Sequence, residues 1–172
     1  MATGKRPAIC YESCKFVLSS RSFPTDGRSW VFRALHRGGA VFVEGAEGLT
    51  VDKCEFTMLD GNALFLSGHT RNVTISNSSF SYIGDNAMAA WGYTDDLPSS
   101  PAADKLPAGT GIDGRAGRQP RHTAVLSNIV REIGLNERQS SAWSEAKACL
   151  STVRGNLMFN MPRCAEADKP AT

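Results

Sequence analysis

The feature that most constrains the fold of this chain is an internal repeat. Two segments, Gly48–Phe56 and Asn72–Phe80, carry apolar residues at matching places, and each matched pair is 24 residues apart. A second block that begins at Gly39 returns at Asn62 and again at Asn86, after 23 and 24 residues. Self-similarity at a fixed period is typical of solenoids, in which each repeat packs only against its neighbours. We therefore expect the chain to fold as stacked coils.

Apolar and polar residues alternate within each repeat. Leu49 and Val51 have one polar residue between them, as do Val73 and Ile75 in the next repeat. This period of two is that of a β-strand with one buried face. The segment 136–150 is richest in helix-forming residues, but its serines and glutamine interrupt the pattern, and we interpret it as another coil with irregular turns. Short strands joined by tight turns predict an all-β fold, a parallel β-helix of four to five coils.

Stacking of the coils predicts which residues meet. Phe56 should lie against Phe80, and Val51 against Ile75, at the usual strand separation of ~4.8 Å. Asparagine also recurs when Ser76-Asn77 is aligned with Ser127-Asn128, 51 residues later, and Asn156 with Asn77. Asparagine tolerates left-handed backbone geometry, and its side-chain amide can bond to the same group in the next coil. This alignment predicts an asparagine ladder at one turn position: Asn77, Asn128 and Asn156.

The repeat is interrupted once. Residues 94–121 contain four of the eight prolines, with Gly, Ala, Ser and Asp, and have no apolar periodicity, so they are predicted to be a long loop insertion. We interpret residues 1–172 as a single β-helix domain, with a disordered tail at 1–7 and an irregular tail at 164–172. The abrupt change of pattern after Arg163 suggests a fragment of a longer β-helix.

Composition excludes few functions. Lys and Arg number 19 against 17 Asp and Glu, and the main basic run lacks interleaved aromatics, so no nucleic-acid partner is expected. The apolar stretches are too short to span a membrane. No apolar segment near the start reads as a secretory signal. The five cysteines have irregular spacing, which does not predict a disulfide framework or a zinc site.

The repeats carry a resemblance to a known family. Residues 62–84 resemble the right-handed parallel β-helix proteins of the pectin-lyase-like superfamily. Residues 128–134, 139–141 and 156–163 are similar to a poorly characterised subgroup of it, and the likeness covers roughly residues 8 to 163. The resemblance implies a right-handed parallel β-helix, a polysaccharide or glycan partner, an extracellular location and, in some members, Ca²⁺ as a cofactor.

Enzymes of this kind resemble one another in using carboxylates, a basic residue and sometimes calcium on the outside of the coils. A lyase needs a cation to neutralise a uronate and a base to remove the neighbouring proton, whereas glycosidases use paired carboxylates. The resemblance therefore suggests catalytic roles for Arg131, Glu132 and Lys147, and a cation site at Asp85 and Glu132. Three of these residues have a simpler interpretation: Asp85 as a turn cap, and Arg131 with Glu132 as a solvated ion pair.

Aromatic and basic residues complete the set of candidates. Aromatic rings stack on sugar rings when they are exposed, and otherwise pack in a core or under a loop. Substrate binding is assigned on this basis to Trp91, Tyr93, Trp143, His69 and Arg71. Trp91 takes the place of Ser67 of the preceding repeat and should lie at the base of the insertion.

Three functions stay open from the sequence. The first is part of a polysaccharide lyase or hydrolase. The second is a non-catalytic module that binds glycans or proteins, as in adhesion. The third is a fragment without independent activity.

Overall fold

The computed structural model describes residues 10–12, 15–17, 37–93 and 118–163, which form fourteen short β-strands and no helix. Five strands form sheet A: β1 (Cys10–Glu12), β4 (Thr50–Asp52), β7 (Thr74–Ser76), β10 (Ala124–Leu126) and β13 (Thr152–Arg154). Five form sheet B: β2 (Lys15–Val17), β5 (Glu55–Leu59), β8 (Ser79–Ile83), β11 (Ile129–Ile133) and β14 (Leu157–Phe159). Four form sheet C: β3 (Val41–Glu44), β6 (Leu64–Ser67), β9 (Met88–Trp91) and β12 (Trp143–Ala146).

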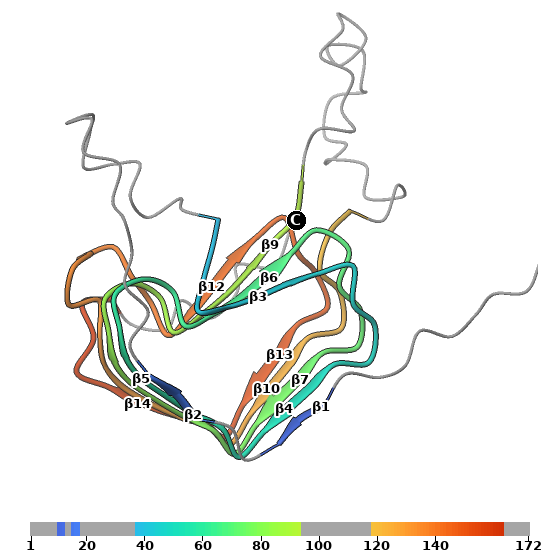
Figure 1. Cartoon of the computed structure of the whole chain (residues 1–172). Helices are drawn as coiled ribbons and strands as arrows, with labels where there is room; N and C mark the ends of the chain where they lie inside the picture. The colour runs from blue at the N-terminus through green and yellow to red at the C-terminus, as the bar shows by residue number, and fades with distance from the viewer. Residues whose placement is uncertain (1–9, 13–14, 18–36, 94–117, 164–172) are drawn as a thin grey trace, which may run out of the picture.

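The chain passes through sheets A, B and C in turn, so that each strand pairs with the strand three places later in the sequence. All the pairings are parallel, and the register repeats from coil to coil, with Val51 beside Ile75 and Leu64 beside Met88. Figure 1 shows the result: the strands stack in three walls around a common interior. The fold is a parallel β-solenoid, as the repeat predicts. Among the described residues, no helix is long and apolar enough to cross a membrane.

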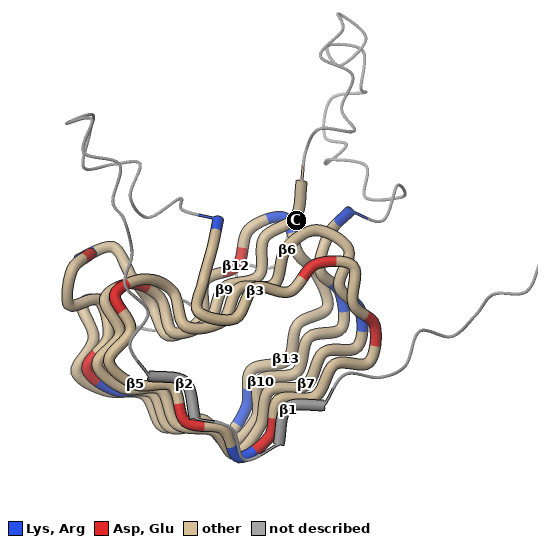
Figure 2. The backbone as a smooth tube through the Cα atoms, in the orientation of Figure 1, with Lys and Arg blue, Asp and Glu red and all other residues tan. Residues whose placement is uncertain are grey.

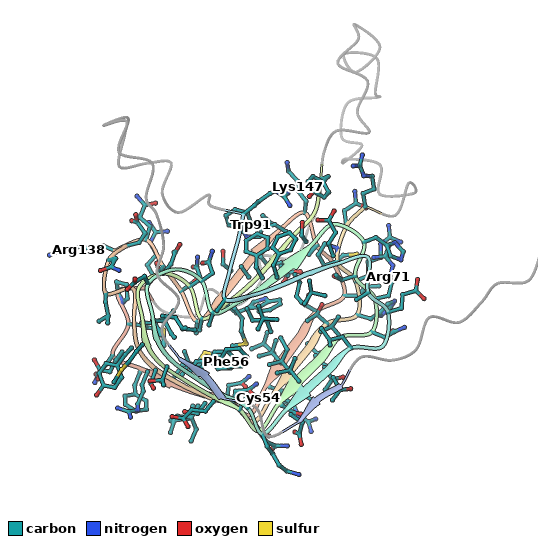
Figure 3. The ribbon with its side chains drawn as sticks, in the orientation of Figure 1. Cys54, Phe56, Arg71, Trp91, Arg138 and Lys147 are labelled. Carbon is teal, nitrogen blue, oxygen red and sulfur yellow. The ribbon has the colours of Figure 1, made fainter. Side chains whose placement is uncertain are left out.

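The interior is filled by apolar ladders that run from coil to coil. Phe56 and Phe80 lie stacked, with ring centroids 4.6 Å apart and planes 3° from parallel. Val51 and Ile75 are fully buried beside each other in the next ladder. Figure 3 shows Phe56 directed into this interior. The predicted stacking is therefore confirmed, and each coil buries side chains that it could not bury alone.

The asparagine ladder exists, but the predicted alignment is wrong by one residue. The coils pair Ile75 with Val125 and Phe80 with Val130, which are 50 residues apart and not 51. A slip of one residue would turn Val125 outward and direct Arg131 into the core, because side chains alternate between the two faces of a strand. Burial of the apolar residues therefore overrides the match between asparagines.

With the corrected register, the turn between sheets A and B has two successive positions. The residues that occupy one position in successive coils form a column. One column has a left-handed backbone in the four coils whose turn residues are described: Lys53, Asn77, Ser127 and Gly155, with φ between 49° and 69°. The next holds the ladder itself: Cys54, Ser78, Asn128 and Asn156. Within it, Asn128 Nδ2 donates to Asn156 Oδ1 at 3.0 Å, and Asn128 Oδ1 accepts from the Ser78 amide at 2.9 Å. Asn77 is therefore a turn residue, and Asn128 and Asn156 form the ladder.

Arg121, the last residue of the predicted insertion, is paired with the solenoid. Its backbone bridges Arg71 and Cys149 in the neighbouring coils. The segment 94–117 lies outside the described residues, as do the predicted tails at 1–7 and 164–172. Residues 136–150 contain β12 and its flanking turns, which agrees with their interpretation as an irregular coil.

Charged residues lie mostly at strand ends and in the turns. Figure 2 shows this distribution, with most strand positions uncharged. The exceptions are few: Arg131 and Glu132 lie within β11, and Glu145 lies within β12. Charges inside strands need a specific account, because a strand of a solenoid offers each side chain either the apolar interior or the outer face.

Candidate functional site

The outer face of sheet C carries the most varied set of side chains. In β3, Val41 and Val43 are buried in the interior while Phe42 and Glu44 point outward. The strand register extends these outward positions into two columns, Phe42–Phe65–Ala89–Ser144 and Glu44–Ser67–Trp91–Ala146. Aromatic, acidic and hydroxyl side chains therefore share one face of the solenoid.

Three aromatic rings form a row on this face. Phe42 and Phe65 are stacked with centroids 5.8 Å apart, and Trp91 meets Phe65 edge-on at 5.2 Å. The small side chain of Ala89, beside Phe65 in the same column, leaves room for the indole. Trp91 Nε1 donates to Ser144 Oγ at 3.4 Å. Figure 3 shows Trp91 on the outside of sheet C, where its neighbours leave it only 7% exposed.

Tyr93 is the centre of a polar cluster beside this row. The guanidinium carbon of Arg37 lies 4.1 Å from the centroid of the Tyr93 ring, and that of Arg118 lies 5.1 Å from it. The phenol oxygen accepts a hydrogen bond from Ser67 Oγ at 3.1 Å and donates to Glu44 Oε2 at 3.3 Å. We call these five residues (Arg37, Glu44, Ser67, Tyr93 and Arg118) the Tyr93 cluster.

Gly68 makes room for the tyrosine ring. A Cβ at this position would lie 2.8 Å from a ring carbon of Tyr93, and the backbone there has a left-handed φ of +55°. Both conditions favour glycine, because a side chain would clash with the ring and strain the backbone. The turn that follows β6 thus provides the space that the Tyr93 ring occupies.

The same residues hold the two ends of the insertion. Arg37 donates through Nη1 to the carbonyl of Trp91 at 3.3 Å and through Nη2 to that of Gly92. The Tyr93 amide donates to the Arg118 carbonyl at 3.0 Å, which ties the residue before the insertion to the residue after it. The residues on either side of 94–117, Tyr93 and Arg118, therefore lie together in the Tyr93 cluster. Binding residues are often found where a rigid scaffold supports a long loop.

A second arginine, Arg71, contacts the chain that follows the insertion. Arg71 donates through Nη1 to the carbonyls of Thr70, at 2.9 Å, and Gln119. Burial, and to a lesser extent the charge of Arg121, lowers the pKa of Arg71 from its usual value. Gln119 in turn donates through Nε2 to the Tyr93 carbonyl at 3.3 Å. Arg71, predicted to bind substrate, here hydrogen-bonds to the backbone at Thr70 and Gln119.

Two of the predicted aromatic residues come together, and one does not. Trp91 and Tyr93 both lie on the outer face of sheet C, next to the insertion, as their positions in the repeat suggest. Trp143 is different: it stands in the interior column Val41–Leu64–Met88–Trp143 and is 4% exposed. Its position in β12 directs Trp143 inward, which is the core packing that the sequence left open as the alternative to stacking on sugars.

The predicted catalytic residues are divided between two walls. Arg131 and Glu132 lie on the outer side of sheet B, where Arg131 is 5.4 Å from the Tyr82 ring centroid and Glu132 Oε1 accepts from Asn160 Nδ2 at 2.7 Å. Lys147 follows β12 at the turn from sheet C to sheet A, and Figure 3 shows it on the same side of the solenoid as Trp91. The fold does not assemble these three side chains into one site.

The proposed cation site is also divided. Asp85 lies at the turn from sheet B to sheet C and is 2% exposed. Its Oδ1 accepts from Ser140 Oγ at 2.9 Å and from the Asn86 amide at 3.0 Å, the contacts of a residue that organises a turn. Within the described ranges, no group of three or more His, Cys, Asp and Glu residues could hold a metal ion. Ca²⁺ binding therefore stays a prediction from resemblance.

His69, the last predicted binding residue, lies apart from the Tyr93 cluster. Its Nε2 is 2.8 Å from Glu47 Oε1 at the turn from sheet C to sheet A. An exposed polar contact of this kind contributes little to stability and gives no sign of a ligand.

Four members of the Tyr93 cluster escaped the sequence reasoning: Arg37, Glu44, Ser67 and Arg118. Glu44 and Ser67 share a place in the repeat, but nothing in their local sequence marks them as binding residues. They meet Tyr93 only because the coils bring residues from four separate segments to one face.

Comparison of the chain with protein-family models, with curated proteins and with solved structures gives no match. The geometry of the chain itself is therefore the basis for any function.

Proposed function

We propose that this protein is a carbohydrate-binding β-solenoid that binds a glycan chain at the Tyr93 cluster. The observation that carries the proposal is the environment of Tyr93, a partly exposed ring with an arginine at 4.1 Å and a carboxylate at 3.3 Å from its hydroxyl. Sugars have apolar faces that stack on aromatic rings, and hydroxyl groups that hydrogen-bond to charged side chains. The cluster offers both within one surface.

Its position supports the same function. Phe42, 48% exposed, extends the aromatic surface from Tyr93 toward the first coil. Two members of the cluster, Tyr93 and Arg118, flank residues 94–117 in the sequence, and binding residues are often found next to long loops. Arg37 and Arg118 add positive charge, and arginine pairs well with carboxylates. An acidic polysaccharide is therefore the first ligand to test.

The finer features of the fold belong to this proposal too. Crossover connections between parallel strands are right-handed in about 98% of cases, so we infer a right-handed β-helix. The repeats resemble the pectin-lyase-like superfamily, which is consistent with a glycan partner and an extracellular location. Neither feature is required for binding at the Tyr93 cluster.

Binding is favoured over catalysis by the arrangement of the acidic and basic residues. A lyase or hydrolase needs its acid and base within hydrogen-bonding reach of one substrate. Arg131 and Glu132 lie on sheet B, whereas Lys147 lies beyond sheet C. The set chosen by resemblance therefore gives no basis for a single reaction centre.

The test is binding of the purified full chain to immobilised acidic and neutral polysaccharides. We expect Tyr93→Ala to abolish retention. Tyr82→Ala is the matched control, because it removes an exposed tyrosine that lies against Arg131 on sheet B. Equal loss of retention in both variants, or retention that survives Tyr93→Ala, would refute the proposal.

A second candidate function is uronate cleavage at the same cluster. The contact between Tyr93 and Glu44 favours it, because a phenol hydrogen-bonded to a carboxylate can transfer a proton while the two arginines neutralise a uronate. Absorbance of an unsaturated product, lost in Glu44→Gln, would establish cleavage. Retention of the polysaccharide without any product would leave binding as the function.

A further inference from the structure

Two arginines occupy the same position in adjacent coils, at the turn between sheets C and A. Isolated β-bridges align Glu47, Arg71, Arg121 and Cys149 in four successive coils. Neighbouring members of such a column have backbones ~4.8 Å apart. Figure 3 shows Arg71 on the outside of the solenoid at this corner, and Arg71 and Arg121 are both partly exposed. Their two coils have a described coil on either side.

The positive charges of these two arginines repel each other. Burial, and then the charge of Arg121, lower the pKa of Arg71, whereas Cys149 and Glu47 each raise it by less. The charge of Glu47, the acidic residue among the four, thus does not cancel that of Arg121. Like charges in adjacent positions of a sheet are destabilising, and an anion that contacts both of them favours their charged forms.

Hydrogen bonds hold one side chain of the pair in place. Arg71 Nη1 donates to the carbonyls of Thr70, at 2.9 Å, and Gln119. Gln119 also connects the pair to the Tyr93 cluster, because its Nε2 donates to the Tyr93 carbonyl at 3.3 Å. The arginine pair and the Tyr93 cluster are therefore adjacent, and one ligand chain can contact both.

We propose that Arg71 and Arg121 together bind a tetrahedral oxyanion, a sulfate or phosphate ester carried by the glycan at the Tyr93 cluster. The carrier rests on the proposed function, whereas the oxyanion rests on the arginine pair alone. A guanidinium group is a planar fork that can take up both oxygens of one carboxylate. A phosphate ester presents three acceptor oxygens in a tetrahedral arrangement, as a sulfate ester does, so it can accept from two guanidinium groups at once. The pair therefore selects an esterified glycan over one with carboxylates alone.

The test compares two ligands that differ only in their esters: chondroitin sulfate, and the same polysaccharide after a chemical desulfation that keeps its carboxylates. Titration calorimetry of the full chain is done at one ionic strength, because salt screens exposed charges. The wild type should bind the sulfated chain about tenfold more tightly, the gain from one further charge-assisted hydrogen bond. Arg121→Gln should bind the two chains equally. Equal binding by the wild type, or an unchanged preference in Arg121→Gln, would overturn the proposal.

Two further variants separate the pair from its surroundings. Arg138→Gln removes one positive charge from the exposed turn before β12, on the opposite side of the solenoid from Arg71 in Figure 3, and should keep the full preference. Loss of the preference in Arg138→Gln would mean that net charge alone attracts the sulfated chain, which also contradicts the proposal. Arg121→Lys keeps the charge without the planar fork and should restore the preference only in part.

Inorganic sulfate and phosphate test the pair independently of the glycan. Either ion should shift the guanidinium ¹⁵N signal of Arg71 in the wild type but not in Arg121→Gln, and the more tightly bound ion identifies the ester. If neither polysaccharide binds while the ions still shift this signal, the proposed function fails and the oxyanion site stands. If neither ion shifts it, the oxyanion site fails, whatever the polysaccharides do.

Discussion

The guanidinium group of Arg37 lies over the ring of Tyr93, with its central carbon 4.1 Å from the ring centroid. The same group donates hydrogen bonds to Ser67 Oγ and to the carbonyls of Trp91 and Gly92. Arg37 precedes β3, and its contacts thus join the coil that contains β3 (coil 1) to those that contain β6 (coil 2) and β9 (coil 3), across the outer face of sheet C. Through this contact, the position of the proposed binding ring depends on residues far from it in sequence.

Removal of Arg37 should weaken glycan binding without unfolding the protein. Arg37→Ala loses a cation–π contact worth about 0.5–2 kcal/mol, and with it the clamp on the Trp91 and Gly92 carbonyls. We expect weaker polysaccharide retention and a melting temperature lowered by several degrees, with the protein still folded at room temperature. Arg37→Lys keeps the charge but not the planar fork, and should restore binding only in part. Full retention in Arg37→Ala would contradict the role of this contact.

Gly68 should be required for the position of Tyr93. The Gly68→Ala variant places a methyl group 2.8 Å from the ring and imposes a left-handed φ of +55° on alanine. We expect a loss of stability of about 1–2 kcal/mol and displacement of the ring. Aromatic NMR signals of Tyr93 would report the displacement. Gly155→Ala is the control: it has a similar φ, of +69°, but its nearest neighbour lies at 3.5 Å, so it should cost stability without affecting Tyr93.

The stacked phenylalanines should be among the most sensitive positions for stability. Phe56 is fully buried against Phe80, so Phe56→Ala leaves a cavity and should lower the free energy of unfolding by about 3–5 kcal/mol. Met58, two residues along the same strand, is 56% exposed. Met58→Ala should therefore cost less than about 1 kcal/mol. Urea denaturation of both variants, followed by circular dichroism, gives the comparison.

The corrected register makes different predictions for two asparagines. Asn128 is buried and bonds to the Ser78 amide, the Ile75 carbonyl and Asn156. Asn128→Ala should cost about 2–4 kcal/mol, because buried backbone groups lose their partners. Asn77 instead has a φ of +49° in the exposed turn, a conformation that glycine adopts easily. Asn77→Gly loses only the exposed hydrogen bond to Asp52 and should cost clearly less, about 1 kcal/mol. A cost equal to that of Asn128→Ala would restore the one-residue shift.

Stability should depend on the ionisation of Asp52. Hydrogen bonds from Ser76 Oγ, at 2.6 Å, and Asn77 Nδ2, at 2.8 Å, lower the pKa of Asp52 below its usual value. A carboxyl group whose pKa is lower in the folded than in the unfolded state stabilises the protein above its unfolded pKa of about 4. That contribution is lost as the pH falls through the folded pKa.

The measurement is urea denaturation of the wild type and Asp52→Asn between pH 7 and pH 2. We expect the wild type to be more stable at neutral pH and the difference to shrink in acid. Asp60→Asn controls for the removal of one negative charge. A difference that stays constant across the whole range would show that the carboxylate form of Asp52 has no special role.

Much of the solenoid could be predicted because its physical cause is local and repeated. Residues Leu49, Val51, Val73 and Ile75 alternate with polar neighbours, and the alternation alone shows which side of each strand faces the interior. The 24-residue period then places Phe56 on Phe80. The prediction failed between coils 3 and 4, where the insertion removes the constant spacing and a match of Ser-Asn pairs was the only guide. There the burial of Val125 and Val130 decides the register.

The candidate site could be predicted only in part. Trp91 and Tyr93 were identifiable because they come directly before a proline-rich interruption of the repeat. The sequence left two places open for Trp143, because the irregular turn before β12 conceals which of its residues face inward. Arg37 and Arg118 carry no local signal at all. Their contact with Tyr93 depends on how far long side chains reach across neighbouring coils.

By itself, then, the sequence determined the period of the coils, the alternation of their strands and the identity of most core residues. These properties follow from the burial of an apolar side chain at every second residue, and this alternation is visible in the amino-acid sequence. Only the tertiary structure decided the register after the insertion, the inward direction of Trp143, and the meeting of Arg37, Glu44 and Tyr93. Those features depend on the lengths and shapes of the turns, and a difference of one residue in a turn reverses the face on which a side chain lies.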